Sequence, residues 1–266
     1  MSAIRVGAVQ YLNARPLVHG LDSQKDLFSL EFDVPAKCAS LLHERSIDLG
    51  LIPTIEYLRK PNYRLVPDIG VVSQGPVESV ALFTSRPVQA IRSIAVDTSS
   101  RTAATLLRIL CAEWFDIEPN FHTMPPDLDS MLKRCDAALL IGDVALYTEH
   151  ETIVDLDKID LGEEWTSMTS LPFVWAVWSG RDGAVDSEHL SALEKARDAG
   201  VQALDEIAEQ FGPTDEDQVE LAREYLQKNV QFELTDECRN GLRRYFDFAL
   251  KMGIYQHSGE LQFYEK

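Results

Sequence analysis

Ser93-Ile94-Ala95-Val96-Asp97-Thr98-Ser99-Ser100-Arg101-Thr102 sets the architecture expected for this chain, and it runs into the apolar-rich segment 103–110. Residues 94–96 are apolar and partly β-branched, which indicates a strand buried in a sheet. A polar turn of hydroxyl residues around Arg101 follows, and apolar residues then recur with a helical period. The sequence therefore predicts a strand, a tight turn and the N-terminus of a helix.

The start of this helix suits a small anion. Backbone N–H groups in the first turn of a helix lack partners, and the helix dipole is positive there. Ser99, Ser100 and Thr102 add hydroxyl donors, so the turn would suit a carboxylate or a phosphate. The turn contains no glycine, which argues against a phosphate loop. The alternative is that Thr98 or Ser99 only caps the helix, as Ser and Thr often do.

Composition and charge limit the class of protein and its partners. The chain has 266 residues, 45% of them hydrophobic, which is enough for one large or two ordinary domains. A net charge of −18 argues against a nucleic acid or an anionic membrane as partner. No apolar run approaches the length of a membrane span, and no segment resembles a signal peptide. We therefore expect a cytoplasmic protein, and the sequence leaves its oligomeric state open.

The cysteines and histidines do not predict a metal site. The four cysteines are widely spaced, without a Cys-x-x-Cys pair, and no two histidines have the spacing His-x-x-x-His. The cysteines are expected to be buried free thiols: Cys38, Cys111, Cys135 and Cys238.

Strands and helices alternate along the first two thirds of the chain. Strands are expected at 4–9, 28–34, 48–53, 64–73, 77–84, 94–96, around 121, at 137–141 and at 173–178, with helices between them. Such alternation predicts parallel strands joined by crossover helices. From 186 to 252 three helices are expected, with Asp186, Thr214 and Thr235 as N-caps.

This order predicts two α/β domains, one inserted into the other. The first would comprise 1–85 and 180–266, with the C-terminal helices packing on it, and the inserted second domain 86–179. The connecting strands 77–84 and 173–179 would lie side by side as a hinge. Ligands of open α/β sheets bind beyond the carboxyl ends of strands. Four segments should therefore line one cleft, with Ser79 at its floor: Tyr11–Arg15, Ile52–Glu56, Thr98–Thr102 and Ile141–Asp143.

Four segments have the order and spacing of one known family: Val6–Asn13, Asp97–Thr102, Ala137–Asp143 and Leu171–Trp178. They resemble the chorismate dehydratases, which open the futalosine route to menaquinone. The resemblance covers roughly residues 4–180, and the C-terminal helices are similar only in length and helical character. It implies a type II periplasmic-binding-protein fold used as a cytoplasmic enzyme. It also implies loss of water from chorismate, without a cofactor, to give 3-[(1-carboxyvinyl)oxy]benzoate.

The residues suit this chemistry. Chorismate is a dicarboxylate, and its ring carboxylate is conjugated to the carbon that must lose a proton. Donors at a helix N-terminus would stabilise the charge that develops on that carboxylate. We expect Ser99, Ser100 and Thr102 to bind it, and Ser79 and Asn13 to orient the rest of the substrate.

The base that takes the proton is left open. Asn13 stands where a base would be convenient, but an amide is no base at neutral pH. Glu56, Asp143 and the substrate's own enolpyruvyl carboxylate are the candidates, and we favour the last. Asp97 is discounted because its charge would repel the ligand. Our catalytic candidates are thus Asn13 and Glu56, and Tyr11 and Asp143 are expected to contact the substrate.

Plainer roles exist for several of these residues, and two other functions share the expected fold. Asn13 suits a turn, Asp143 could cap a helix, and Glu56 could be a surface carboxylate. Trp175 and Trp178 are expected to pack at the hinge. A transporter's solute-binding protein would bind a small carboxylate without chemistry. The sister dihydroxynaphthoate synthase of the same pathway would cleave a cyclic futalosine derivative.

Overall fold

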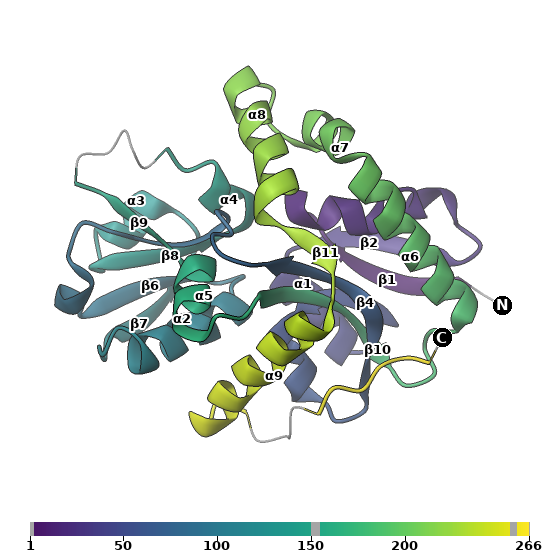
Figure 1. Ribbon diagram of the computed structural model, residues 1–266, viewed down its shortest axis with the longest axis horizontal. Coiled ribbons are helices and arrows are strands. Elements are labelled where there is room, and N and C mark those ends of the chain that lie inside the picture. The colour runs from purple at the N-terminus through teal and green to yellow at the C-terminus, as the bar shows by residue number, and fades with distance from the viewer. Residues whose placement is uncertain (1–2, 150–154, 256–259, 266) are drawn as a thin grey trace.

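The chain forms two α/β halves, each built on its own sheet (Figure 1). The computed structural model describes residues 3–149, 155–255 and 260–265. The first half contains the sheet of β1 (Ile4–Val9), β2 (Phe28–Asp33), β3 (Leu49–Pro53), β4 (Tyr63–Ser73), β10 (Phe173–Arg181) and β11 (Gln231–Glu233). The second half contains the sheet of β5 (Val80–Thr84), β6 (Ser93–Asp97), β7 (Asn120–Met124), β8 (Ala137–Ile141) and β9 (Asp157–Asp160).

Parallel pairs lie within both sheets, as the alternation of strands and helices predicts. The first sheet has the order β11-β4-β10-β3-β1-β2, and β1 is parallel to β2 and β3. The second has the order β7-β6-β8-β5-β9, and β6 is parallel to β7 and β8. Parallel neighbours end at the same edge of a sheet, so the segments after β1 and β3 lie close together, as do those after β6 and β8.

The two strands expected to form a hinge do not lie side by side. β5 pairs with β8 and β9 in the second sheet, whereas β10 pairs with β3 and β4 in the first. Each strand therefore satisfies its backbone groups within one sheet, and the predicted pairing of 77–84 with 173–179 is wrong. The domain limits at 85/86 and 179/180 stay a prediction; strand pairing groups 80–84 with the second half and 173–181 with the first.

Helices cover the sheets, and residues 186–252 contain four α-helices and a π-helical turn where three helices were expected. The first half contains the 3₁₀ segments η1 (Leu12–Val18), η2 (Leu21–Ser23) and η3 (Thr54–Arg59), with α1 (Pro35–His43). The second contains η4 (Val88–Ala90), α2 (Thr102–Glu113), α3 (Leu128–Leu132), α4 (Gly142–Leu146) and α5 (Leu161–Thr169). The C-terminal part contains α6 (Ser187–Gln202), α7 (Leu204–Phe211), α8 (Glu216–Glu224), the π-helical η6 (Tyr225–Asn229) and α9 (Asp236–Lys251).

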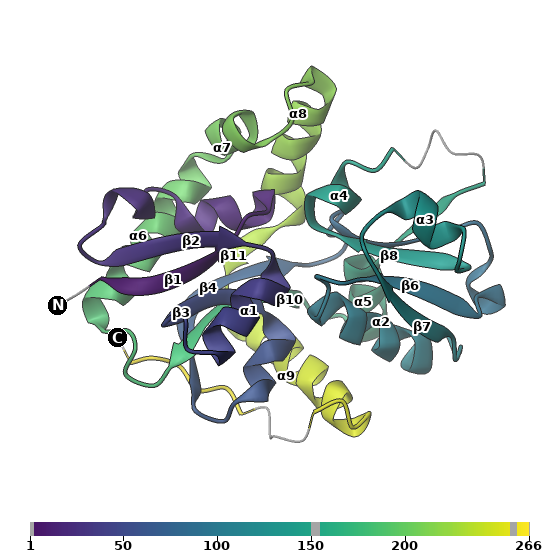
Figure 2. The ribbon, with the colours of Figure 1, turned by 180° about the vertical axis from the view of Figure 1, so that it is seen from behind.

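The C-terminal helices begin near the predicted caps. Asp186 and Thr235 cap α6 and α9 as predicted, but Asp215 and not Thr214 caps α8, because the Asp215 carboxylate accepts from the N–H of Gln218. The helices α6 and α7 pack on η1, as expected for packing on the first half. The helix α9 contacts both β10 and α2, and α8 stands over the junction of the halves (Figures 1 and 2).

Aromatic rings help to join the halves. Trp165 of α5 meets Phe173 of β10 edge to face, with ring centroids 5.2 Å apart, and Tyr245 of α9 meets Phe173 at 4.9 Å. Such geometry adds about 0.5–1.5 kcal/mol per pair to the burial of the rings. The junction of the halves is therefore a packed core on the side of α5 and α9.

The expectations about cysteines hold. All four are buried and free, at 38, 111, 135 and 238. No helix among residues 3–149, 155–255 and 260–265 is long and apolar enough to cross a bilayer. Within the same residues, no group of His, Cys, Asp and Glu side chains could hold a metal ion.

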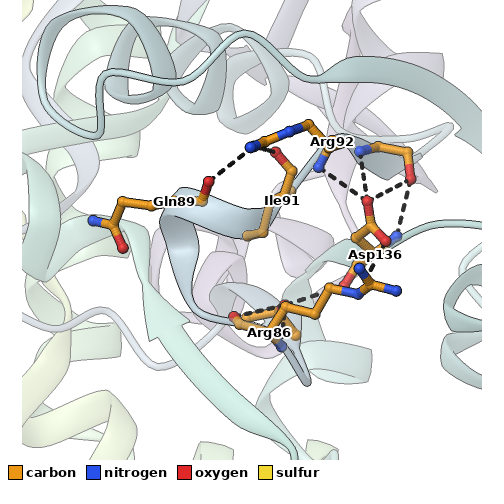
Figure 3. Close-up of polar contacts among 7 residues, drawn as sticks. Arg86, Gln89, Ile91, Arg92 and Asp136 are labelled. Atoms are coloured by element: carbon orange, nitrogen blue, oxygen red, sulfur yellow. Dashed lines mark hydrogen bonds and ion pairs between the residues drawn. The ribbon is translucent and has the colours of Figure 1, made fainter.

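Asp136, which immediately precedes β8, holds the chain that enters β6 in place (Figure 3). Its Oδ2 accepts from the backbone N–H groups of Arg92 at 2.9 Å and Ser93 at 3.0 Å. Its Oδ1 pairs with Arg86 Nε at 3.1 Å. The hydrogen bond from the Arg92 backbone, with those from Ser93 and the charge of Arg86, lowers the pKa of Asp136 although burial opposes the shift.

Replacing Asp136 with alanine is expected to lower the free energy of unfolding by about 1.5–3 kcal/mol, the usual contribution of hydrogen bonds to a charged group. Because the folded pKa is below the unfolded value of about 3.9, this stabilisation is fully present above pH ~4 and is lost as the pH falls through the folded pKa. Denaturant unfolding at several pH values tests this. The free energies of unfolding of the variant and the unmodified protein should converge in acid. A difference that persists undiminished there would contradict this role of the Asp136 carboxylate.

Candidate active site

A cavity lies where strand ends of the two halves meet. Its wall includes residues that follow β1, β6 and β8, together with Pro53 at the end of β3, so each of the four segments predicted to line one cleft contributes to it. Trp175 and Ala176 of β10 contribute another part of the wall. The polar wall residues are Tyr11, Asn13, Ser99, Ser100, Arg101 and Thr102.

The turn between β6 and α2 is closed by Asp97. Its Oδ1 accepts from both the backbone N–H and the hydroxyl of Ser99, each at 2.8 Å. Burial raises the pKa of Asp97, and the two donations from Ser99 oppose that rise. Neither Thr98 nor Ser99 caps α2, whose preceding residue, Arg101, makes no capping bond. Asp97 therefore holds the turn and leaves the N-terminus of α2 uncapped beside the cavity.

The hydroxyl groups of Ser100 and Thr102 differ in their hydrogen bonds. Ser100 is 5% exposed, and within the described residues its Oγ has no hydrogen-bond partner. Thr102 Oγ1 accepts from the backbone N–H of Ile55 at 3.2 Å, so this hydroxyl joins the turn to η3. A buried hydroxyl without a partner costs about 1–3 kcal/mol. Ser100 is therefore the clearest sign that this wall is built for a ligand.

Tyr11 covers the start of α4. Its hydroxyl lies 3.4 Å from Ser99 Oγ, and its ring lies over Gly142. Gly142 has φ +65°, and a Cβ there would lie 2.7 Å from a carbon of the ring, so only glycine fits. Burial raises the pKa of Tyr11, which keeps its hydroxyl protonated at neutral pH.

Asn13 and Ser79 both contact Tyr225, a residue that the sequence analysis did not single out. Asn13 lies in the wall, and its Nδ2 donates to the hydroxyl of Tyr225 at 2.9 Å. The same hydroxyl lies 2.8 Å from Ser79 Oγ. Ser79 itself is outside the wall, although its neighbour Val80 belongs to it. The expected floor residue is thus connected to the wall through Tyr225 and Asn13.

Asp143 joins the halves beside the cavity and is outside its wall. Its Oδ1 accepts from the backbone N–H of Leu12 at 3.0 Å. Burial raises the pKa of Asp143, opposed by that bond and by the charge of Arg15. The Arg15 guanidinium lies against the rings of Phe32 and Phe211, at 4.8 and 4.3 Å from their centroids. Asp143 is placed to hold η1 against α4.

Glu56 is also outside the wall, in a buried ion cluster. It is 1% exposed, and its carboxylate lies 2.6 Å from His43 Nε2, 3.0 Å from Arg101 Nη1 and 3.1 Å from Arg59 Nε. The hydroxyl of Tyr255 donates to Oε1 at 3.2 Å. Burial alone would raise the pKa of Glu56, but the bond to His43 and the charges of Arg101 and Arg59 bring it below its ordinary value. A carboxylate paired in this way is a weak base.

The two tryptophans expected at a hinge differ. Trp178 is fully buried, in agreement with a packing role. Trp175 forms part of the cavity wall, and its Nε1 donates to Ser73 Oγ at 3.0 Å. Trp175 is 8% exposed and packs on Phe173, with ring centroids 4.3 Å apart, so it packs as expected and also borders the cavity.

Comparisons with known proteins agree with these features. A family described as menaquinone biosynthesis matches residues 4–251. A chorismate dehydratase of Thermus thermophilus is 30% identical, over 94% of this chain and 95% of its own length. A chorismate dehydratase of Campylobacter jejuni is 26% identical, over 88% of each chain.

Solved structures share the fold. The protein AF1704 of Archaeoglobus fulgidus is similar with a TM-score of 0.75 and 17% identity, over 95% of this chain and 98% of its own. The periplasmic aliphatic sulphonate binding protein of Escherichia coli is similar with a TM-score of 0.62 and 16% identity, over 97% and 95%. The expected two-domain, periplasmic-binding-protein-like fold is therefore confirmed.

Proposed function

The chain belongs to the menaquinone-biosynthesis family, and from that membership we propose that it is a cytoplasmic chorismate dehydratase of the futalosine route. The enzyme is a hydro-lyase that removes water from chorismate, a small dicarboxylate, and forms 3-[(1-carboxyvinyl)oxy]benzoate. The observation that supports this most directly is Ser100, a buried hydroxyl without a protein partner at the start of α2. A carboxylate of the substrate would accept its hydrogen.

The ring carboxylate binds at the N-terminus of α2. Ser100 and Thr102 donate to it, together with backbone N–H groups of the first turn. Removal of the proton from the ring carbon that bears the enolpyruvyl ether spreads negative charge onto this carboxylate. The donors are fixed in place beforehand and bind more strongly as the charge grows, so they lower the barrier.

The substrate's enolpyruvyl carboxylate takes that proton. The wall residues, within the described part of the chain, include no Asp, Glu or His, which supports a base carried by the substrate. The electron pair of the broken C–H bond enters the ring, and the ring hydroxyl leaves as the ring becomes aromatic. The proton held by the enolpyruvyl carboxyl group passes to the departing hydroxide, so that the products are the benzoate and one water.

Chorismate added to the purified protein tests the function, with a new aromatic absorbance followed over time. Growth of that absorbance is expected. Binding of chorismate without conversion would make the chain a solute-binding protein. Conversion of a cyclic futalosine derivative, but not of chorismate, would make it the sister dihydroxynaphthoate synthase.

Ser100→Ala is expected to weaken chorismate binding by tenfold or more, because a charge-assisted hydrogen bond contributes about 1.5–3 kcal/mol. Calorimetric titration of the folded variant measures the change. Thr98→Ala is the matched control, since Thr98 is an exposed hydroxyl residue of the same turn and lies outside the wall. Unchanged affinity in Ser100→Ala would place the carboxylate elsewhere.

A further inference from the structure

Tyr225 joins three segments that are far apart in the sequence. It is the first residue of η6, and it is 1% exposed. Its hydroxyl contacts Asn13, which follows β1, and Ser79, which precedes β5. Figures 1 and 2 show the helix that carries it, α8 continued by η6, over the junction of the two halves. π-Helical segments such as η6 are rare and often lie at functional sites.

The hydrogen atoms available to these groups set the direction of the hydrogen bonds. Burial raises the pKa of Tyr225, so its hydroxyl keeps its single hydrogen at neutral pH. Since Asn13 Nδ2 donates to this hydroxyl, the Tyr225 hydrogen is left for Ser79 Oγ. The bonds then run head to tail from Asn13 through Tyr225 to Ser79, an order in which each bond strengthens the next.

The bond from Nδ2 to Tyr225 sets which end of the Asn13 amide is left free. In the reversed amide, Oδ1 would take the hydrogen of Tyr225, and Ser79 would have to donate its own hydrogen to the Tyr225 oxygen. With Nδ2 held by Tyr225, the other end of the amide is Oδ1, which has no protein hydrogen-bond partner within the described residues. Asn13 belongs to the cavity wall, so the free end of its side chain is an acceptor available to a ligand.

We propose that Tyr225 is a positioning residue, and this proposal rests on the dehydration proposed above. Tyr225 holds the Asn13 amide so that Oδ1 faces the substrate carboxylate that takes the proton. An acceptor beside a carboxylate disfavours the charged form and accepts a hydrogen bond from the protonated form, so it raises the pKa of that carboxylate. A raised pKa makes the enolpyruvyl carboxylate a stronger base. The same hydrogen bond holds the new carboxyl group until its proton passes to the leaving hydroxide.

Tyr225→Phe is the test, because it removes the hydroxyl and keeps the ring. Without that hydroxyl the amide can turn Nδ2 towards the substrate carboxylate, which favours the charged form. We expect kcat to fall by tenfold or more, with KM unchanged or lower. A change in the shape of the binding site alone would instead raise KM. Tyr264→Phe is the matched control, since Tyr264 is a buried tyrosine whose hydroxyl donates to the backbone oxygen of Arg181.

A double mutant separates positioning from a general effect on structure. In an Asn13→Ala background, Tyr225→Phe should lower kcat no further, since the amide that it positions is gone. Equal and additive losses in both backgrounds would overturn the proposal. So would a kcat for folded Tyr225→Phe within twofold of the unmodified enzyme.

Ser79→Ala gives a second route if Tyr225→Phe does not fold. Without Ser79 Oγ, the hydrogen of Tyr225 has Asn13 Oδ1 as its remaining acceptor, and the amide should reverse. We expect a fall in kcat of fivefold or more at unchanged KM, and an unchanged kcat would contradict the proposal. If the unmodified enzyme does not convert chorismate, the proposed function fails; if it does and the variants match it, only the role of Tyr225 fails.

Discussion

Replacing Asn13 with alanine is expected to reduce chorismate turnover by about 10²-fold or more, the largest loss among the residues of the wall. By the proposal above, the amide oxygen accepts a hydrogen bond from the enolpyruvyl carboxyl group once that group holds the proton, and misplacement of a reacting group by about 1 Å can cost about 10²-fold. Steady-state kinetics of the folded variant measures the loss. The affinity for chorismate should change far less, because Ser100 and Thr102 still bind the ring carboxylate.

Asp143→Asn and Glu56→Gln are the comparison variants for this experiment. Both keep the shape of a carboxyl side chain and remove its charge, and both residues lie outside the wall. If the base is the substrate's own, neither should lose as much turnover as Asn13→Ala. A loss of about 10²–10⁴-fold in either one, with substrate affinity preserved, is the usual effect of removing a general base and would contradict a substrate-carried base.

Much of the fold follows from local patterns in the sequence. The run 94–96, the polar turn and the apolar period after it correspond to β6 and α2, and 137–141 corresponds to β8. The partners of β5 and β10 could not be obtained in this way, because both are apolar runs that either sheet could accept. The strand β11, at 231–233, is too short for an alternation of apolar and polar residues to be seen.

The cavity was predictable to the level of segments, and individual side chains were not. Four strand ends converge, as parallel topology requires. Glu56 follows β3 as expected, but consecutive residues of a 3₁₀ helix point about 120° apart. Its neighbour Ile55 bonds to Thr102, while Glu56 lies among His43, Arg59 and Arg101. Tyr225 lies 212 residues from Asn13, and no local pattern connects the two.

Glu56→Gln is expected to lower the free energy of unfolding by about 3–5 kcal/mol, the usual effect of breaking a buried ion cluster from one side. His43 and Arg101 would be left without their carboxylate. Because the folded pKa of Glu56 is below its unfolded value, its stabilisation is fully present above about pH 4.3 and is lost as the pH falls through the folded pKa. Denaturant unfolding from pH 7 into acid should show the free energies of unfolding of the variant and the unmodified protein converging.

Glu224→Gln is the control, since Glu224 forms an exposed pair with Lys228 and the same substitution there should change stability by about 0–1 kcal/mol.

Arg101 connects the cluster to the anion-binding turn, because it lies in the cavity wall and pairs with Glu56. Chorismate affinity should therefore fall in Glu56→Gln, while turnover at saturation changes by less than tenfold. Unchanged chorismate affinity in a stable Glu56→Gln protein would mean that the ion cluster does not influence the binding site. Abolished turnover in a stable Glu56→Gln protein would make Glu56 the base.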